Sequence, residues 1–238
     1  MSQVEGGGVL DPNFLIKMLS PQLYGTGPTA SALPTILKTL EQLQNKGVLA
    51  RLLDLNRIIL GGHSAGGRVA IESASPQFFS QVVASFAYGA HTAAAVQIGY
   101  EPGTILPLPD RLPMLLIGGT CDGVIAESSH RYGVSWEQPT TPIQRTFQDA
   151  IAGGRNDSYL LLLEGANHFS IAQTFDSTTG RPFLDFPETQ PRAKLQDLMI
   201  EAIALFLEAR VKSQPEAIAA LERLTTANRE AIAAFECK

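Results

Sequence analysis

One serine lies where an apolar run meets several glycines, in the stretch RIILGGHSAGGRVAIESA, residues 57 to 74. Ser64 is the central residue of the pattern G-x-S-x-G, between Gly62 and Gly66. A serine that stands clear of its own backbone between a strand and a helix needs a tight turn, and such a turn has room only for small neighbours. The spacing therefore predicts a nucleophilic serine, and we expect Gly62 and Gly66 to be the two close positions.

The flanking pattern decides between this interpretation and two others. An apolar run precedes Ser64 and a helical pattern follows it, which is the context that a nucleophile turn requires. A glycine-rich turn with a structural serine is the first alternative. A phosphate-binding loop is the second, and it fails because the stretch has neither a G-K-[ST] ending nor a G-x-G-x-x-G spacing.

A base and a carboxylate must accompany the serine, because a serine hydroxyl is a weak nucleophile at neutral pH. In the fold that carries this motif the order along the chain is Ser, then Asp or Glu, then His. Asp122 follows the apolar run MLLIGG, and His168 follows the run YLLLLEG. Because chemistry gathers at the carboxyl ends of parallel strands, we expect the three side chains to meet. Ser64 is the predicted nucleophile, His168 the general base and acid, and Asp122 its orienter.

Three further histidines could serve as the base. His63 adjoins Ser64 on a sharp turn and should point away from it. His91 follows the second apolar run and could line the pocket, yet it precedes the acid in chain order. His130 is expected at the surface.

Three further carboxylates could serve as the acid. Asp110 and Asp157 each precede an apolar run, which places them at the wrong end of the sheet. Glu164 follows the last run, but it lies in the same loop as His168, only four residues before it. Asp122 remains the preferred acid.

Four short apolar runs predict the sheet that positions these residues: RIILGG, VVASFAYG, MLLIGG and SYLLLLEG. Runs without alternation are typical of parallel strands that are buried on both faces. Helical periods cover residues 33 to 43 and 195 to 206, and a last helix is expected over about 215 to 236. The fold class is α/β, a single domain over residues 1 to 238 with helices on both faces of a mostly parallel sheet.

The composition and charge of the chain limit the kinds of partner that we expect. With 18 basic and 23 acidic residues the net charge is −5, and the sequence has no basic stripe. We therefore do not expect nucleic acid to be a partner. We expect no membrane span and no signal core, and hence a cytoplasmic protein. Cys121 and Cys237 lack the spacing of a metal site, and a bridge between them stays open.

Three motifs together resemble the α/β-hydrolase superfamily: GGHSAGG, GGTCDGVI and EGANHF. More narrowly, they look like the dienelactone-hydrolase-like, chlorophyllase and polyester-hydrolase branch, over roughly residues 30 to 210. The resemblance implies the same roles for Ser64, Asp122 and His168, and it implies the backbone N–H of Ala65 as one oxyanion donor. It implies hydrolysis of a small-molecule carboxylic ester or thioester through an acyl-enzyme, with no metal and no cofactor. Because true dienelactone hydrolases use cysteine at the turn, lactone specificity does not carry over.

Ring side chains near these motifs could form the substrate pocket. Tyr88, Phe169 and Trp136 could give an apolar acyl or aromatic pocket, and each is as compatible with ordinary packing. His63 is a further candidate for substrate binding because it adjoins Ser64.

The region before residue 57 departs from the family pattern, because it contains one convincing helix and no convincing strand. VEGGG, residues 4 to 8, is similar to the glycine-rich oxyanion loop, but it leaves no space for the strand and helix that should follow. We therefore expect an N-terminally shortened fold with half an oxyanion hole. The strand before Ser64 becomes an uncovered edge through which copies could associate. The alternative function is a catalytically impaired fragment that acts as a binding or interaction module.

Overall fold

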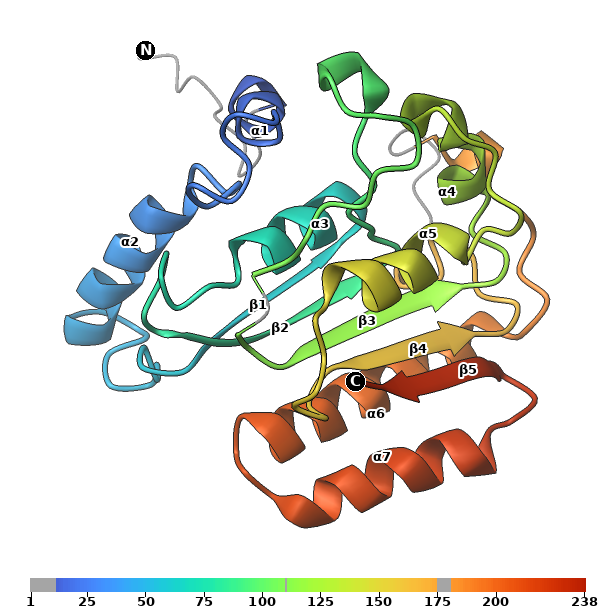
Figure 1. Ribbon diagram of the computed structural model, residues 1–238. Coiled ribbons are helices and arrows are strands. Elements are labelled where there is room, and N and C mark those ends of the chain that lie inside the picture. Colours follow the sequence, from blue (N-terminus) through green and yellow to red (C-terminus); the bar gives the residue numbers. More distant parts are fainter. Residues whose placement is uncertain (1–11, 110, 175–180) are drawn as a thin grey trace.

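The four apolar runs form four parallel strands of one sheet in the computed structural model, which describes residues 12–109, 111–174 and 181–238 (Figure 1). A fifth strand completes the sheet in the spatial order β1-β2-β3-β4-β5. The strands are β1 (Ile58–His63), β2 (Val82–Tyr88), β3 (Met114–Gly119), β4 (Tyr159–Leu163) and β5 (Ile232–Cys237). The predicted α/β class and the four predicted strands are confirmed.

Helices cover both faces of this sheet because successive strand residues point to opposite sides. In β4, Leu161 and Leu163 pack toward α6 and α7, whereas Leu160 and Leu162 pack toward α3 and α5. Figure 1 shows α3 and α5 on one side of the sheet and α6 and α7 on the other. The α-helices are α1 (Pro12–Met18), α2 (Leu33–Asn45), α3 (Ser64–Ser73), α4 (Gly123–Glu127), α5 (Thr141–Arg145), α6 (Arg192–Arg210) and α7 (Pro215–Ala227). Shorter turns are η1 (Val96–Ile98), η2 (Ser129–Tyr132), η3 (Thr146–Ala150) and η4 (Pro182–Leu184).

The strand register brings the carboxyl ends of β1 to β4 together at one end of the sheet. His63 pairs with Tyr88, Tyr88 with Ile117, and Gly119 with Leu163. The loops that follow these strands therefore start side by side, at the arrowheads of β1 to β4 in Figure 1. Any chemistry carried by these loops is concentrated at that end of the sheet.

The expected long C-terminal helix over residues 215 to 236 is wrong in its last part. The helix α7 ends at Ala227, and Ile232–Cys237 forms β5, antiparallel to β4. Without β5, the backbone of β4 would present an open edge, and pairing satisfies its hydrogen-bonding groups. The Phe235 ring also stacks on Tyr159, with ring centroids 5.6 Å apart. Tertiary pairing thus overrides the local helical period.

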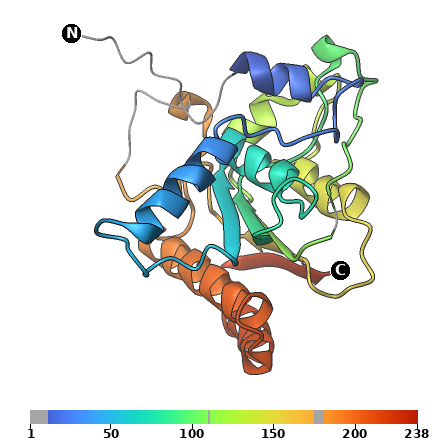
Figure 2. The same cartoon turned by 90° about the vertical axis from the view of Figure 1, so that its left-hand side faces the viewer.

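The strand β1 lies at the other edge of the sheet, and α2 packs beside it (Figure 2). Leu33, Leu37 and Leu40 of α2 share an apolar cluster with Ile58 and Leu60 of β1. Association of copies through this edge stays a prediction, and VEGGG lies outside the described residues.

Two remaining expectations concern the cysteines and the membrane. Cys121 and Cys237 are both free thiols. None of the helices in the described ranges combines the length and the apolar character that a bilayer crossing requires.

Candidate active site

The turn between β1 and α3 gives Ser64 a left-handed backbone, with φ of 55°. Such a conformation is uncommon for a residue with a side chain, and its cost is met only where the surroundings enforce it. Here the strand ends at His63 and the helix begins at Ser64, with no connecting residue. The sharp turn predicted from the G-x-S-x-G pattern is therefore present, and Ser64 remains half-buried rather than enclosed.

The two close glycines of this turn are Gly62 and Gly67, so the expectation for Gly66 is wrong. A Cβ on Gly62 would lie 2.4 Å from the Gly66 carbonyl oxygen, and one on Gly67 would lie 2.8 Å from the Gly62 carbonyl oxygen. A Cβ on Gly66 would meet nothing within 4 Å. The backbone of Gly66 therefore lies against Gly62 of β1, whereas a side chain on Gly66 would point into open space.

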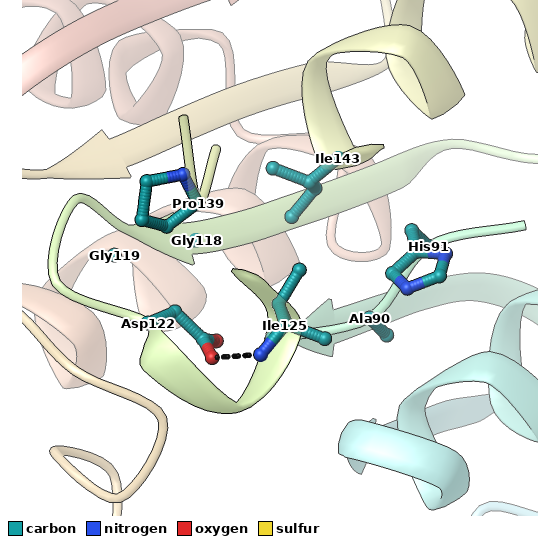
Figure 3. Close-up of a pocket in the computed structure, with 9 residues that line it drawn as sticks. Ala90, His91, Gly118, Gly119, Asp122, Ile125, Pro139 and Ile143 are labelled. Atoms are coloured by element: carbon teal, nitrogen blue, oxygen red, sulfur yellow. Dashed lines mark hydrogen bonds between the residues drawn. The ribbon is translucent and has the colours of Figure 1, made fainter. Parts of the chain in front are cut away.

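The loops after β3 and β4 bring Asp122 and His168 together. His168 Nδ1 lies 2.8 Å from Asp122 Oδ2. The other carboxylate oxygen, Oδ1, accepts a hydrogen bond of 2.9 Å from the Ile125 N–H at the start of α4, as Figure 3 shows. Both side chains are about 2% exposed. Because a carboxylate oxygen can only accept, Nδ1 carries the imidazole proton and Nε2 is left as an acceptor.

Gly89 lies close both to the Asp122–His168 pair and to Ser64. It follows Tyr88 in β2, the register partner of His63, and so lies beside Ser64. A Cβ on Gly89 would lie 3.1 Å from His168 Nδ1 and 3.2 Å from Asp122 Oδ2. The three predicted residues therefore gather around one glycine, although Ser64 Oγ makes no hydrogen bond to His168 within the described part of the chain.

A hollow of about 240 Å³ opens beside Ser64, and we call it the serine hollow. Its walls include Ser64, Ala65, Gly89, His91, Ile125 and Tyr132. Ala65 occupies the position after the serine at the start of a helix, where backbone N–H groups have no partner in the helix. A negatively charged oxygen bonded to Ser64 can be stabilised there.

The other histidines have different environments. The His63 ring packs against the His168 ring at a tilt of 48°, with ring centroids 4.5 Å apart, and burial followed by the His168 charge lowers the pKa of His63 to about 4. Burial and then the Arg68 charge lower the pKa of His91 to about 3, and His91 Nδ1 accepts from the Ala93 N–H. His91 lies at the far end of a small pocket from Asp122 (Figure 3). Both rings are therefore neutral at pH 7, and His91 lines the hollow.

The remaining candidates lie away from the serine. His130 and Glu164 are exposed, so the structure pairs His168 with Asp122 and not with Glu164. Asp157 precedes β4 at the opposite end of the sheet and bonds Arg155 at 2.9 Å. Asp110 falls outside the described residues.

The rings expected to bind substrate are buried or half-buried. Tyr88 is 1% exposed, and its hydroxyl donates to the Asn167 carbonyl. Phe169 and His63 are half-buried, with ring centroids 6.2 Å apart, and Trp136 packs on Tyr132. Tyr88, His63 and Phe169 thus contact His168 or the residues beside it, and none of the four rings is among the residues that line the serine hollow.

Asp185 is a residue of the site that the sequence did not single out. Its Oδ1 accepts 2.9 Å from the Gly123 N–H, and its Oδ2 accepts 3.3 Å from the Phe169 N–H. It thus joins the residue after Asp122 to the residue after His168. Burial, with a further contribution from the Asp122 charge, raises the pKa of Asp185. These contacts span distant segments, so no local pattern could have predicted them.

No protein-family model matches the chain, and no curated protein matches it. Within the described ranges, no group of three His, Cys, Asp or Glu residues is placed to hold a metal ion.

The glycine geometry predicts opposite outcomes for two matched substitutions. Gly62→Ala forces the Gly66 backbone to move, so we expect the free energy of unfolding to fall by about 1–3 kcal/mol. Gly66→Ala fills open space within a helix, so we expect no loss and a gain of up to about 1 kcal/mol. Urea unfolding followed by circular dichroism measures both. Equal destabilisation by the two variants would contradict the described packing of the turn.

Proposed function

We propose that the chain is a serine hydrolase with an α/β-hydrolase arrangement, which cleaves a carboxylic ester or thioester through an acyl-enzyme on Ser64. The observation that carries the proposal is the buried hydrogen bond between His168 and Asp122 beside a serine with a positive φ. A structural serine needs no strained backbone, and a structural histidine needs no buried carboxylate on one nitrogen with the other nitrogen left as an acceptor.

The proposed reaction begins with proton transfer from Ser64 Oγ to His168 Nε2 while Oγ attacks the ester carbonyl carbon. The carbonyl π electrons move onto its oxygen, and the N–H of Ala65 stabilises that oxyanion. When the oxyanion collapses, the bond to the alcohol oxygen breaks and His168 returns the proton to it. A water molecule then repeats the sequence, its proton passing to His168 and back to Ser64 Oγ. The acid product leaves and the enzyme is restored.

Asp122 contributes by holding His168 in the reactive tautomer. The imidazolium that forms during each attack lies 2.8 Å from the Asp122 carboxylate, which stabilises the added charge. Since both groups are buried, water screens this interaction little.

The alternative is a binding or interaction module on the same scaffold. One observation favours it, namely that Ser64 Oγ has no hydrogen bond to His168 within the described residues. Catalytic hydrogen bonds are often long in enzymes without substrate and tighten only in the complex. Activity measurements on variants therefore separate the two functions.

The triad predicts a graded loss of 4-nitrophenyl acetate hydrolysis. We expect Ser64→Ala and His168→Ala to lower kcat/KM by at least about a thousandfold, and Asp122→Asn to lower it by a comparable or smaller factor through the wrong tautomer. Glu164→Gln, an exposed carboxylate in the His168 loop, is the matched control and should change kcat/KM less than twofold.

Steady-state kinetics on the four purified variants measures these ratios. An inactive Glu164→Gln protein with a fully active Asp122→Asn protein would reassign the acid. If the wild-type protein has no esterase activity above its Ser64→Ala variant, the hydrolase proposal fails and the binding module is favoured.

Asp185 acts in this scheme as a positioning residue, because it holds the two loops that carry Asp122 and His168. In Asp185→Asn the side-chain amide places N–H groups opposite the backbone N–H donors on one side of the former carboxylate, so at least one hydrogen bond is lost. We expect kcat for 4-nitrophenyl acetate to fall about ten- to a hundredfold while KM stays within about twofold, since misplacement of His168 affects the transition state more than binding.

The matched control is Asp157→Asn, which also removes hydrogen bonds from a carboxylate but at the opposite end of the sheet. It should leave both kcat and KM unchanged. A purely structural role for Asp185 would instead lower the fraction of active protein in Asp185→Asn without changing kcat per titrated site. That result would contradict the positioning role.

A further inference from the structure

Three arginines line the serine hollow, and no carboxylate does. Arg68, Arg131 and Arg181 all contribute to its walls, whereas none of its described lining residues is Asp or Glu. The chain as a whole is acidic, with 23 acidic and 18 basic residues. A hollow that collects only positive charge in an acidic protein favours a negatively charged ligand.

Arg68 is a fixed charge in this wall. It follows Ser64 by four positions in α3 and therefore lies about one helical turn, ~5.4 Å, along the same face. Its Nε donates 2.9 Å to Glu72 Oε1, and its Nη1 donates 2.8 Å to the Ala93 carbonyl. Its Nη2 is buried without a hydrogen-bond partner in the described part of the chain. The guanidinium is thus held in place with one donor group unsatisfied.

Glu72 balances part of the Arg68 charge, but it does so from outside the hollow. The Glu72 side chain is almost fully buried and lines a separate pocket with Tyr24 and Thr29. The unbalanced positive charge at the hollow therefore belongs chiefly to Arg131 and Arg181. Both are exposed, and neither side chain forms an ion pair with a residue in the described ranges.

The two free arginines come from different segments that meet at the hollow. Arg131 lies in η2, after the loop that carries Asp122, and Arg181 directly precedes η4, whose next residue is Asp185. Neither participates in the proton transfers proposed above. Planar guanidinium groups recognise carboxylates through paired N–H donors, which suits them to bind a substrate anion.

The acyl part of the proposed ester, and not its alcohol part, would occupy the serine hollow. His168 must face the departing alcohol in order to protonate it, and His168 is not among the lining residues. Ala65, the proposed oxyanion donor, and Arg68 both line the hollow, so the space runs from the carbonyl position along α3. An acyl chain placed there would direct its far end toward the arginines.

We propose that the serine hollow binds an acyl group that carries a terminal carboxylate, so that the preferred substrate is a half-ester of a dicarboxylic acid. This inference rests on the proposed hydrolase function. The proposed specificity of that same site comes from Arg131 and Arg181, with Arg68 as a third, fixed positive charge in the wall.

The test compares two esters of equal acyl length, mono-4-nitrophenyl adipate and 4-nitrophenyl hexanoate, which differ in the terminal carboxylate. After subtraction of the uncatalysed rates, we expect wild-type kcat/KM to be at least about tenfold higher for the adipate ester. We expect Arg131→Gln and Arg181→Gln each to lower this ratio about three- to tenfold, and 0.5 M NaCl to lower it further through screening. The double variant should bring the ratio close to one.

Arg223→Gln is the matched control, because Arg223 is an exposed arginine on α7 at the other face of the sheet. It should leave the ratio unchanged. A wild-type ratio at or below one, with hexanoate hydrolysed, would overturn the inference and leave the hydrolase function intact. A ratio that survives in the Arg131→Gln/Arg181→Gln double variant would overturn it as well.

If neither ester is hydrolysed, the proposed function fails, and calorimetry with adipate itself decides the binding inference. Adipate binding to the wild-type protein that is lost in the double variant supports a carboxylate site. Absence of binding to the wild-type protein overturns it.

Discussion

The hydrogen bond between His168 Nδ1 and Asp122 Oδ2 joins loops 46 residues apart in the chain, and the rest of the candidate site depends on it. It fixes the imidazole tautomer and thereby orients Nε2. The pair can form only because β3 and β4 are neighbours in register, so that their following loops start side by side. The sheet register is thus a functional constraint as well as a structural one.

Small residues at the strand ends allow the loops to approach closely enough for this bond. A Cβ on Gly119 would lie 2.1 Å from the Ala166 carbonyl oxygen, and one on Gly123 would lie 2.2 Å from the Leu184 carbonyl oxygen. The Ala166 carbonyl accepts 2.9 Å from the Cys121 N–H, and Thr120 Oγ1 accepts 2.8 Å from the Gly165 N–H. Backbone contacts of this kind preorganise the site before any substrate arrives.

The sequence was informative where local pattern and tertiary structure agree. The apolar runs predicted β1 to β4 because buried parallel strands need continuous apolar residues, and the order Ser64, Asp122, His168 predicted which loops would meet. The sequence was misleading at β5, where pairing with β4 outweighs a helical period, and at Gly66, whose free side-chain position depends on the direction of one backbone turn. Asp185 could not be found, since its partners come from two distant loops. Arg68 could have been noticed, because four residues after Ser64 place it on the same helical face.

Most of the positive charge beside the serine comes from segments that carry no motif. Arg131 lies in η2, which follows α4, and Arg181 directly precedes η4. The residues proposed for chemistry are therefore held by the sheet, whereas those proposed for specificity belong to the connecting segments, a division common in α/β enzymes.

The most direct test of the central claim is covalent labelling with a fluorophosphonate, followed by intact-mass analysis and peptide mapping. We expect one adduct, on Ser64, that is absent in Ser64→Ala and strongly slowed in His168→Ala, because labelling requires an accessible serine activated by its base. An unlabelled wild-type protein, or an adduct that persists in Ser64→Ala, would contradict it.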